Sequence, residues 1–380
     1  MPSAERVTRV ARSRPRRPVL RRVVLSALSF AALLGLLSAG VIGYVYKKYD
    51  GQIRRIAALQ TKDPNIKNPA AQAHAQNFLI IGSDTRQGAD SAFGSDPGQR
   101  SDTTIVVHLS ADHRRASIIS IPRDAWVQIP RCTASDGSSV AAHSEMFNSA
   151  FSIGGARCTI ATVQKLTGIA VTHYIQIDFV GFKQVVNALG TVTICSPKAV
   201  DDPNSNLKLH AGNNTLDGAQ ALHYVRARES LGDGSDLGRI KRQQQFLGVV
   251  LRQAMSGSLL RNPVRLADFL DAATKSITVD KATTFADLRT LAGSLHGLDP
   301  KRVVFYTAPI ANRDYAPPGS GVSGKVLLDA AKGAVLYRSV IDDRPTASRP
   351  SGTSTTTSGA GTSSTAPKPN LDAAQKTCRL

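Results

Sequence analysis

The stretch NFLIIGSDTR, residues 77–86, decides the fold because a short apolar run ends at Gly82 and polar side chains follow at once. A run of this kind, bounded by a turn residue, is typical of a strand buried inside a sheet. Residues 100–110, RSDTTIVVHLS, have the reverse order, with a charged pair before the apolar run. If the two strands are antiparallel neighbours, both charged ends lie at one edge of the sheet.

The rest of the chain between residues 77 and 344 alternates between strand and helix patterns. Expected strands cover residues 116–122, 172–178, 191–194, 224–228 and 302–307. Expected helices cover residues 179–189, 215–223 and 325–341, and one from an N-cap at Asp236 to about Ala254. Without an internal repeat, this order predicts an α/β fold with a mixed central sheet flanked by helices.

The N-terminal part of the chain has the pattern of a membrane anchor. Residues 23–46 carry no charge and would extend about 36 Å as a helix, enough to span a bilayer. Residues 1–22 hold eight arginines, whereas only Lys47 and Lys48 follow closely, so the positive-inside rule puts the N-terminus in the cytoplasm. A cleaved signal peptide is the alternative, and the length of the apolar run favours the uncleaved anchor.

These patterns predict a single-pass protein of the cell membrane with five segments. They are a cytoplasmic Arg-rich tail (1–22), a transmembrane helix (23–46), a polar stalk (47–76), an extracytoplasmic catalytic domain (77–344) and a disordered Ser/Thr/Gly/Pro-rich tail (345–380). The formal net charge of +19 would suit nucleic acid, but a domain beyond the membrane does not meet the chromosome. We therefore expect no nucleic-acid partner, and instead a phosphate carried by a lipid or an envelope polymer.

The four cysteines fit an oxidising compartment. Cys132 and Cys158 flank one segment of the domain and could form a disulfide that closes it. Cys195 ends a predicted strand and Cys378 lies three residues from the C-terminus, and the sequence does not pair them. No Cys/His spacing indicates zinc.

The two charged strand ends could form a metal site. If Asp84 and Asp102 meet at the sheet edge, their carboxylates would repel one another unless a cation lay between them. Mg²⁺ suits such a site, since it takes one or two carboxylates together with substrate phosphate and waters. The alternative is a pair of ordinary salt bridges to Arg86 and Arg100. A third strand end, SIPRD, adds Arg123 and Asp124 to the same region.

The segment YVRARESLGDGSDLGRIKRQQQF, residues 224–246, concentrates arginine. As a strand it would put Arg226 and Arg228 on one face about 7 Å apart, which suits two neighbouring phosphates. On the following helix, positions 239, 242 and 243 cluster within two turns, and Asp236 could orient Arg239. The planar guanidinium favours bidentate phosphate contacts. The alternative is a solvated helix face.

Together these motifs resemble the LytR–CpsA–Psr family of envelope proteins. The resemblance runs from about residue 75 to residue 255 and comprises FLIIGSDTR, RSDTTIVVHLS, SIPRD, FNSAFSIGG, HYIQIDFVGFKQVVNALG and the arginine-rich segment. High Ala and Arg content would fit an actinobacterial member. The resemblance implies a family fold with a lipid groove and a phosphotransferase that uses Mg²⁺. Such an enzyme moves a glycopolymer from a polyprenyl-diphosphate carrier to peptidoglycan, with a phosphodiester link as the product.

By the same resemblance, individual residues take expected roles. Asp84 and Asp102 resemble the metal-associated aspartates, and Asp102, Arg123, Asp236 and Arg239 are the expected catalytic residues. The expected diphosphate ligands are Arg100, Arg123, Lys183, Arg226, Arg228, Arg239 and Gln243. In the mechanism, Asp124 is one candidate for a general base, and Asp102 is another only if the metal leaves it free. Relatives with a cysteine at the position of Cys195 often have a second one in the following loop, where this chain has Asn213 and Asn214.

Two other functions share these features. A hydrolase would cleave the lipid diphosphate with water at the same site and would need no acceptor glycan. A non-catalytic regulator would need a cytoplasmic domain, and 22 residues are too few to fold into one.

Overall fold

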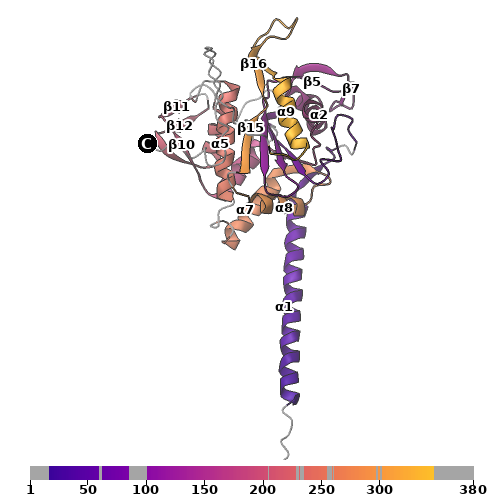
Figure 1. Ribbon diagram of the computed structural model, residues 1–380. Helices are drawn as coiled ribbons and strands as arrows, with labels where there is room; N and C mark the ends of the chain where they lie inside the picture. The colour runs from indigo at the N-terminus through magenta and orange to yellow at the C-terminus, as the bar shows by residue number, and fades with distance from the viewer. Residues whose placement is uncertain are drawn as a thin grey trace, which may run out of the picture. The chain divides into compact units, whose positions relative to one another are not determined.

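The computed structural model describes residues 17–59, 62–84, 101–203, 205–227, 231, 235–254, 259, 261–296, 298–299 and 302–345. The chain divides into two compact units between Gly51 and Gln52. The described part of the first unit is α1 (Arg17–Gln52) without its last residue, and Figure 1 shows this helix in indigo. Within the described residues, α1 is the one helix that is long and apolar enough to cross a bilayer, as an anchor or a signal sequence would be.

The second unit is built around a seven-stranded sheet in the order β1-β14-β9-β2-β3-β4-β15. The two central pairs, β2–β3 and β3–β4, are antiparallel, while β9 pairs with β2 and β15 with β4 in parallel. The sheet is therefore mixed, as the sequence predicts. The strands in spatial order are β1 (Arg54–Ile56), β14 (Ile277–Asp280), β9 (His173–Ile177), β2 (Gln76–Ser83), β3 (Ser101–Leu109), β4 (Ala116–Ile121) and β15 (Val303–Thr307).

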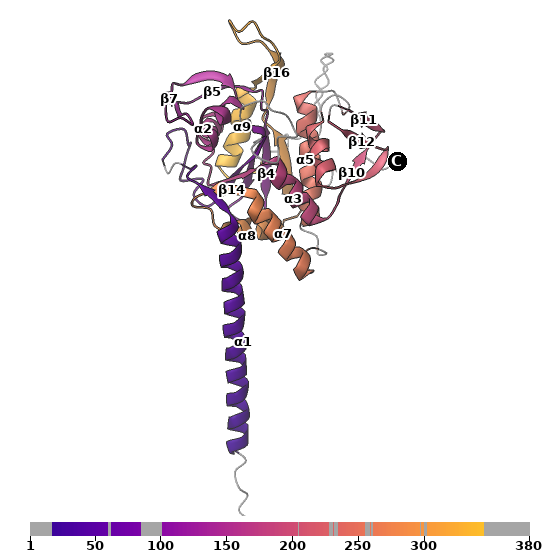
Figure 2. The same ribbon diagram turned by 180° about the vertical axis from the view of Figure 1, so that it is seen from behind.

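Helices cover both faces of this sheet, as Figures 1 and 2 show from opposite sides. Successive side chains of a strand point to opposite faces. Leu79 of β2 accordingly lies in the core that α2 (Ser149–Thr167) and α9 (Ala330–Ile341) cover. Its neighbour Phe78 lies in the core beneath α5 (Asp236–Ala254). The remaining helices are α3 (Phe179–Leu189), α4 (Gly218–Arg226), α7 (Pro263–Ser276) and α8 (Phe285–His296).

Five two-stranded antiparallel sheets complete the unit, and the β16–β17 hairpin projects from it in both views. The pairs are β5 (Trp126–Ile129) with β8 (His143–Met146), β6 (Cys132–Thr133) with β7 (Ser139–Val140), β10 (Val192–Ser196) with β13 (Gly212–Leu216), β11 (Val200–Asp202) with β12 (Leu207–Leu209), and β16 (Ile310–Tyr315) with β17 (Lys325–Leu328).

The structure corrects the strand predicted over residues 224–228, because Tyr224–Arg226 form the end of α4. The carboxylate of Asp217 accepts the backbone N–H of Gln220, and the two residues form a capping box that starts the helix. Ala221 and Tyr224 are both buried, and a three-residue spacing is that of a helix face. The predicted same-face strand geometry of Arg226 and Arg228 is thus wrong, and Arg228 lies outside the described residues.

Two other segments also differ from their predicted form. Residues 325–328 of the predicted helix 325–341 pair with β16 as strand β17, and α9 begins only after its N-cap, Asp329. The segment predicted to be a polar stalk contributes β1 to the sheet edge. After β1, the backbone N–H groups of Ala58 and Leu59 donate to Oδ1 of Asp280 at 2.9 and 2.8 Å. This carboxylate fastens the segment to β14.

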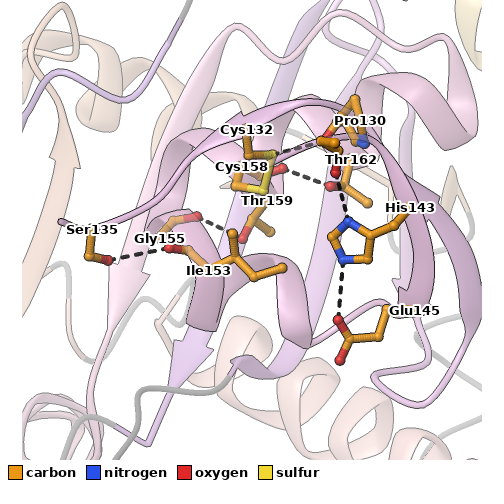
Figure 3. Close-up of a disulfide and its surroundings, with 11 residues drawn as sticks. Pro130, Cys132, Ser135, His143, Glu145, Ile153, Gly155, Cys158, Thr159 and Thr162 are labelled. Atoms are coloured by element: carbon orange, nitrogen blue, oxygen red, sulfur yellow. Dashed lines mark hydrogen bonds and ion pairs between the residues drawn. A yellow bond between two sulfur atoms is a disulfide. The ribbon is translucent and has the colours of Figure 1, made fainter. Parts of the chain in front are cut away.

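The predicted disulfide between Cys132 and Cys158 is present and joins β6 to α2 (Figure 3). Helix α2 is kinked at Gly154 and Gly155, next to this bond. A Cβ atom on Gly154 would lie 2.4 Å from the carbonyl oxygen of Thr133, so only glycine permits this approach of β6 to the helix. Cys195 is also disulfide-bonded and lies opposite Asn213 in the β10–β13 pair, whereas Cys378 lies outside the described residues.

Replacing Cys132 and Cys158 together by serine should lower the free energy of unfolding by about 3 kcal/mol. The bond closes a loop with a sequence separation of 26 residues, and its loss returns that loop entropy to the unfolded chain. Urea unfolding under oxidising conditions measures the change. Adding a reductant should lower the free energy of unfolding of the wild-type protein more than that of the double variant. Equal free energies of unfolding of the two proteins before reduction would contradict the prediction.

Candidate active site

The two predicted metal-associated aspartates lie at the same edge of the central sheet. Strands β2 and β3 are antiparallel, with Gly82 opposite Thr103 and Ser83 opposite Ser101. Asp84, directly after β2, and Asp102, in β3, therefore line one pocket, and Asp84 is buried. The sequence argument for a shared edge is confirmed for this pair. The arginines proposed as their alternative partners, Arg86 and Arg100, lie outside the described residues.

Arg123 joins three aspartates at this edge. It follows β4, and its Nη1 atom lies 2.6 Å from Oδ1 of Asp102. Its Nε atom lies 3.4 Å from Asp124 and 3.7 Å from Asp236. Burial by itself lowers the pKa of Arg123, but the charges of these aspartates outweigh it, so the pKa lies above its ordinary value. Arg123 is therefore a fixed positive charge between two strand ends and α5.

The pair at the start of α5 consists of buried Arg239 and half-buried Asp236. Asp236 is the first residue of the helix, whereas the N-cap is Ser235, whose Oγ accepts the backbone N–H of Gly238 at 3.0 Å. The guanidinium of Arg239 donates to Asp236, as predicted. Burial raises the pKa of Asp236 and lowers that of Arg239, and the attraction between the two charges opposes both shifts. Nε of Arg239 and Oδ2 of Asp236 are buried without a hydrogen bond in the described part of the chain.

Arg242, which the sequence predicts to cluster with Arg239 and Gln243, has a structural role. It is buried, and its two terminal nitrogens donate to backbone carbonyls. Nη1 lies 2.6 Å from the oxygen of Leu231, and Nη2 donates to the oxygen of Ala227. Arg242 thus connects the end of α4 with Leu231 in the segment between α4 and α5, and it is not among the residues that line the pocket.

Arg226 and Gln243 lie on the wall of the pocket, as their predicted roles require. The guanidinium of Arg226 stacks over the ring of Phe179, 4.5 Å from its centre, a cation–π geometry that holds it in place. Nε2 of Gln243 lies 3.4 Å from the carbonyl oxygen of Val225. Lys183 lies on α3 and is not among the residues that line the pocket, so its predicted role stays a prediction.

The pocket itself is a largely apolar cavity of about 890 Å³. Its polar end holds the aspartates and arginines described above. Its walls come from the sheet and from three helices: Ile80, Ile105, Phe179, Phe182, Val185, Val186, Leu222, Val225, Phe246, Leu247 and Val250. The sequence pattern identifies none of these residues as site residues, and only the family resemblance implies an apolar groove. The helical spacing of Phe182 and Val186 on α3 could have indicated a cavity wall, but a helix packed in a core has the same spacing.

Close packing of α3 against α4 shapes one wall of the cavity. A Cβ atom on Gly218, the first residue of α4, would lie 2.3 Å from the carbonyl oxygen of Lys183. The N–H of Gly218 also donates to Oδ1 of Asn187 at 2.7 Å. Glycine at this position therefore lets α4 approach α3 and brings Leu222, Val225 and Arg226 to the cavity.

The arrangement suits an amphiphile with an anionic head and a long apolar tail. Guanidinium groups at the polar end can bind phosphate in a bidentate manner, and the apolar walls can bury a hydrocarbon chain. Among the described residues, the charged side chains that line the cavity belong to four aspartates (84, 102, 178 and 202) and three arginines (123, 226 and 239). No cluster of three or more His, Cys, Asp or Glu side chains suited to a metal ion occurs among the described residues.

The sequence signature of the LytR_cpsA_psr family matches residues 43–325 of this chain. The chain belongs to this family. Among its relatives is the cell wall biosynthesis protein LcpA of Corynebacterium glutamicum, 30% identical over 338 residues, which cover 82% of this chain and 63% of the relative. The chain thus spans less than two thirds of that relative's length. The polyisoprenyl-teichoic acid–peptidoglycan teichoic acid transferase TagU of Oceanobacillus iheyensis is 29% identical over 63% of this chain and 72% of TagU.

Solved structures of family members share the fold. The LytR-Csp2A-Psr enzyme from Actinomyces oris superposes with a TM-score of 0.56 at 22% identity, over 76% of this chain and 95% of that one. TagT bound to LI-WTA superposes with a TM-score of 0.54 at 24% identity, over 76% of this chain and 98% of that one. A mixed sheet with flanking helices is therefore the architecture of the family.

Replacing Arg242 by methionine should lower the free energy of unfolding by about 2–4 kcal/mol, because two buried carbonyl oxygens lose a charged donor. Urea unfolding measures this change. Lys241→Met is the matched control, since Lys241 is the exposed neighbour on the same helix and its replacement should leave stability within about 0.5 kcal/mol. Equal stability of the two variants would refute the structural role of Arg242.

Proposed function

We propose that this chain is a phosphotransferase of cell-wall assembly, which moves a glycopolymer from a polyprenyl-diphosphate carrier to peptidoglycan outside the cytoplasmic membrane. One observation carries the proposal: three arginines, one buried and two half-buried, stand at the polar end of a largely apolar cavity of about 890 Å³. A polyprenyl diphosphate has this same division into charged head and apolar tail. The names of the relatives support the proposal, because TagU is named a polyisoprenyl-teichoic acid–peptidoglycan teichoic acid transferase.

The donor set at the polar end fits a bound Mg²⁺. Asp84 and Asp102 offer carboxylate oxygens at one edge, and Mg²⁺ commonly takes one or two carboxylates with substrate phosphate oxygens and waters. When bound, Mg²⁺ would supply positive charge beside the diphosphate and would polarise the phosphoryl oxygens.

The residues of the chain would position the diphosphate and stabilise its charge. Nε of Arg239 is a buried donor with no hydrogen-bond partner among the described residues, so a phosphate oxygen can take its hydrogen bond. Arg226 and Arg123 would hold further oxygens from neighbouring walls. An acceptor hydroxyl oxygen would then form a bond to the phosphorus that carries the glycan. The bond from that phosphorus to the polyprenyl phosphate would break, and Asp102 or Asp124 would take the hydroxyl proton.

The deciding experiment supplies the protein in detergent with a short-chain polyprenyl-diphosphate glycan, Mg²⁺ and a peptidoglycan oligomer, and follows the products by mass spectrometry. A phosphodiester-linked product that requires the acceptor supports the transferase. Release of polyprenyl phosphate at the same rate without acceptor would point to a hydrolase at this site. The Asp84→Ala/Asp102→Ala variant is the control, and its activity should be lost at every Mg²⁺ concentration.

Replacing Arg239 by alanine should lower turnover by about 100-fold or more, because a preorganised donor to the transferring phosphoryl group is lost. Arg239→Lys keeps the charge without the planar fork and should recover only part of the rate. Lys241→Ala on the exposed side of the same helix should have wild-type turnover. Initial rates of transfer at saturating acceptor give the comparison, and wild-type turnover of folded Arg239→Ala would remove this residue from the mechanism.

Filling the apolar cavity should discriminate between carriers by chain length. Val185→Trp adds a large side chain to the wall contributed by α3, and we expect it to lower the rate with a long polyprenyl chain by about 10-fold. A carrier with one or two isoprene units needs less of the cavity and should react nearly as fast as with the wild-type protein. Equal slowing with both carriers would show that the tail lies elsewhere.

A further inference from the structure

A second pocket, of about 610 Å³, lies in the layer on the other side of the central sheet. It is bounded by β5, the end of α2, the end of β17 and one face of α9. Two aromatic rings belong to its lining, Trp126 on β5 and Tyr337 on α9. Gly333 makes room for the second ring, since a Cβ atom there would lie 3.2 Å from Cε2 of Tyr337. None of its residues lines the cavity described above.

The chemistry of this pocket differs from that of the arginine-lined cavity. Its ionisable groups balance, because Lys67 and Arg338 face Asp329 and Asp342, a formal charge of zero. Aliphatic side chains and the two rings provide flat apolar surface, and Gln128 adds an amide that can both donate and accept hydrogen bonds. An uncharged ligand with apolar faces and many hydroxyl or amide groups suits such a lining. A saccharide has these properties, whereas a hydrocarbon tail would leave the polar groups unpaired.

The backbone connects this pocket directly to the phosphate end of the first cavity. The N–H of Val326 donates to the carbonyl oxygen of Asp124 at 3.0 Å, and Val326 bridges Ala125 in parallel. From this junction one stretch of chain leads to Trp126 and the other to Leu327 and Leu328 in the second pocket. Arg123 and Trp126 are three residues apart, which is about 10 Å in extended chain.

The two pockets therefore approach Arg123 and Asp124 from opposite layers of the fold. In an in-line displacement, the attacking oxygen and the leaving group lie on opposite sides of the phosphorus. If the apolar cavity holds the leaving polyprenyl phosphate, the acceptor must come from another side. The second pocket is a saccharide-suited surface within reach of that position.

We propose that the pocket between β5 and α9 binds the acceptor, as an uncharged stretch of the amino-sugar strand of peptidoglycan, with a pyranose face against Trp126, which is half-buried, while Tyr337 is buried behind it. This inference rests on the proposed transferase function for its biological meaning. The binding itself can be measured without any transfer. The role of the pocket would be to position the acceptor and to set its apparent KM, and it would contribute no group to the chemical step.

The chain offers a direct probe, because Trp126 is its only tryptophan. Titration of the full-length protein in detergent with a linear β-1,4-linked tetramer of N-acetylglucosamine should change the intrinsic tryptophan fluorescence in a saturable manner. Arg338→Ala and Gln128→Ala each remove a polar group from the pocket and should weaken binding by about 2- to 10-fold. Val335→Ala is the matched control on α9, since Val335 is 69% exposed and does not line the pocket.

Two results would overturn the inference. One is no saturable fluorescence change with the tetramer at millimolar concentration, and the other is equal affinity of the wild-type protein and both pocket variants. In the transfer assay, Arg338→Ala should raise the apparent KM for the acceptor and leave kcat unchanged. If no transfer occurs with any acceptor, the proposed function fails while the saccharide titration still decides the pocket. If transfer occurs but the tetramer does not bind here, the function stands and this acceptor site is rejected.

Discussion

The ion pairs of Arg123 are the constraint on which the candidate site depends. Its guanidinium contacts Asp102 of β3, Asp124 after β4 and Asp236 of α5. One side chain therefore connects the ends of two strands with the start of a helix. These groups are only partly accessible to water, and their attraction is therefore screened less than on an open surface. Removing the guanidinium would leave three carboxylates near one another, and the chain would have to separate them. The edge of the sheet keeps its geometry because the charges fix it before any substrate binds.

The central sheet also divides the molecule into two chemical environments. The layer with α3, α4 and α5 contains the apolar cavity with its arginines, and the layer with α2 and α9 contains a charge-balanced pocket lined by two aromatic rings. The segment from Arg123 to Trp126, with its hydrogen-bonded neighbour Val326, connects the two surroundings through the backbone. A reaction between a lipid-linked carrier and a polar acceptor needs such a separation. The carrier requires an apolar environment and the acceptor a polar one, and neither substrate is stable in the environment of the other.

Sequence patterns predicted the parts of the site that follow from strand ends. Asp84, Asp102 and Arg123 terminate or begin apolar runs, and antiparallel pairing of β2 and β3 then brings them together. The same reasoning failed at residues 224–228, because alternation over five residues is also compatible with the last turn of a capped helix, and the cap at Asp217 lies outside that window. The apolar cavity was not predictable residue by residue, since a helix face that lines a cavity has the same spacing as one that packs in a core.

Arg239 and Arg242 illustrate why residue type alone does not reveal a role. They lie three positions apart on α5 and are both buried, yet Arg239 lines the cavity and pairs with Asp236, whereas Arg242 bonds to two backbone carbonyls. A genetic screen for cell-envelope defects would score loss of either residue as the same null phenotype. The causes would differ, because one loss reduces turnover per molecule and the other reduces the number of folded molecules. Only a measurement that normalises activity to the amount of folded protein separates a lesion of chemistry from a lesion of abundance.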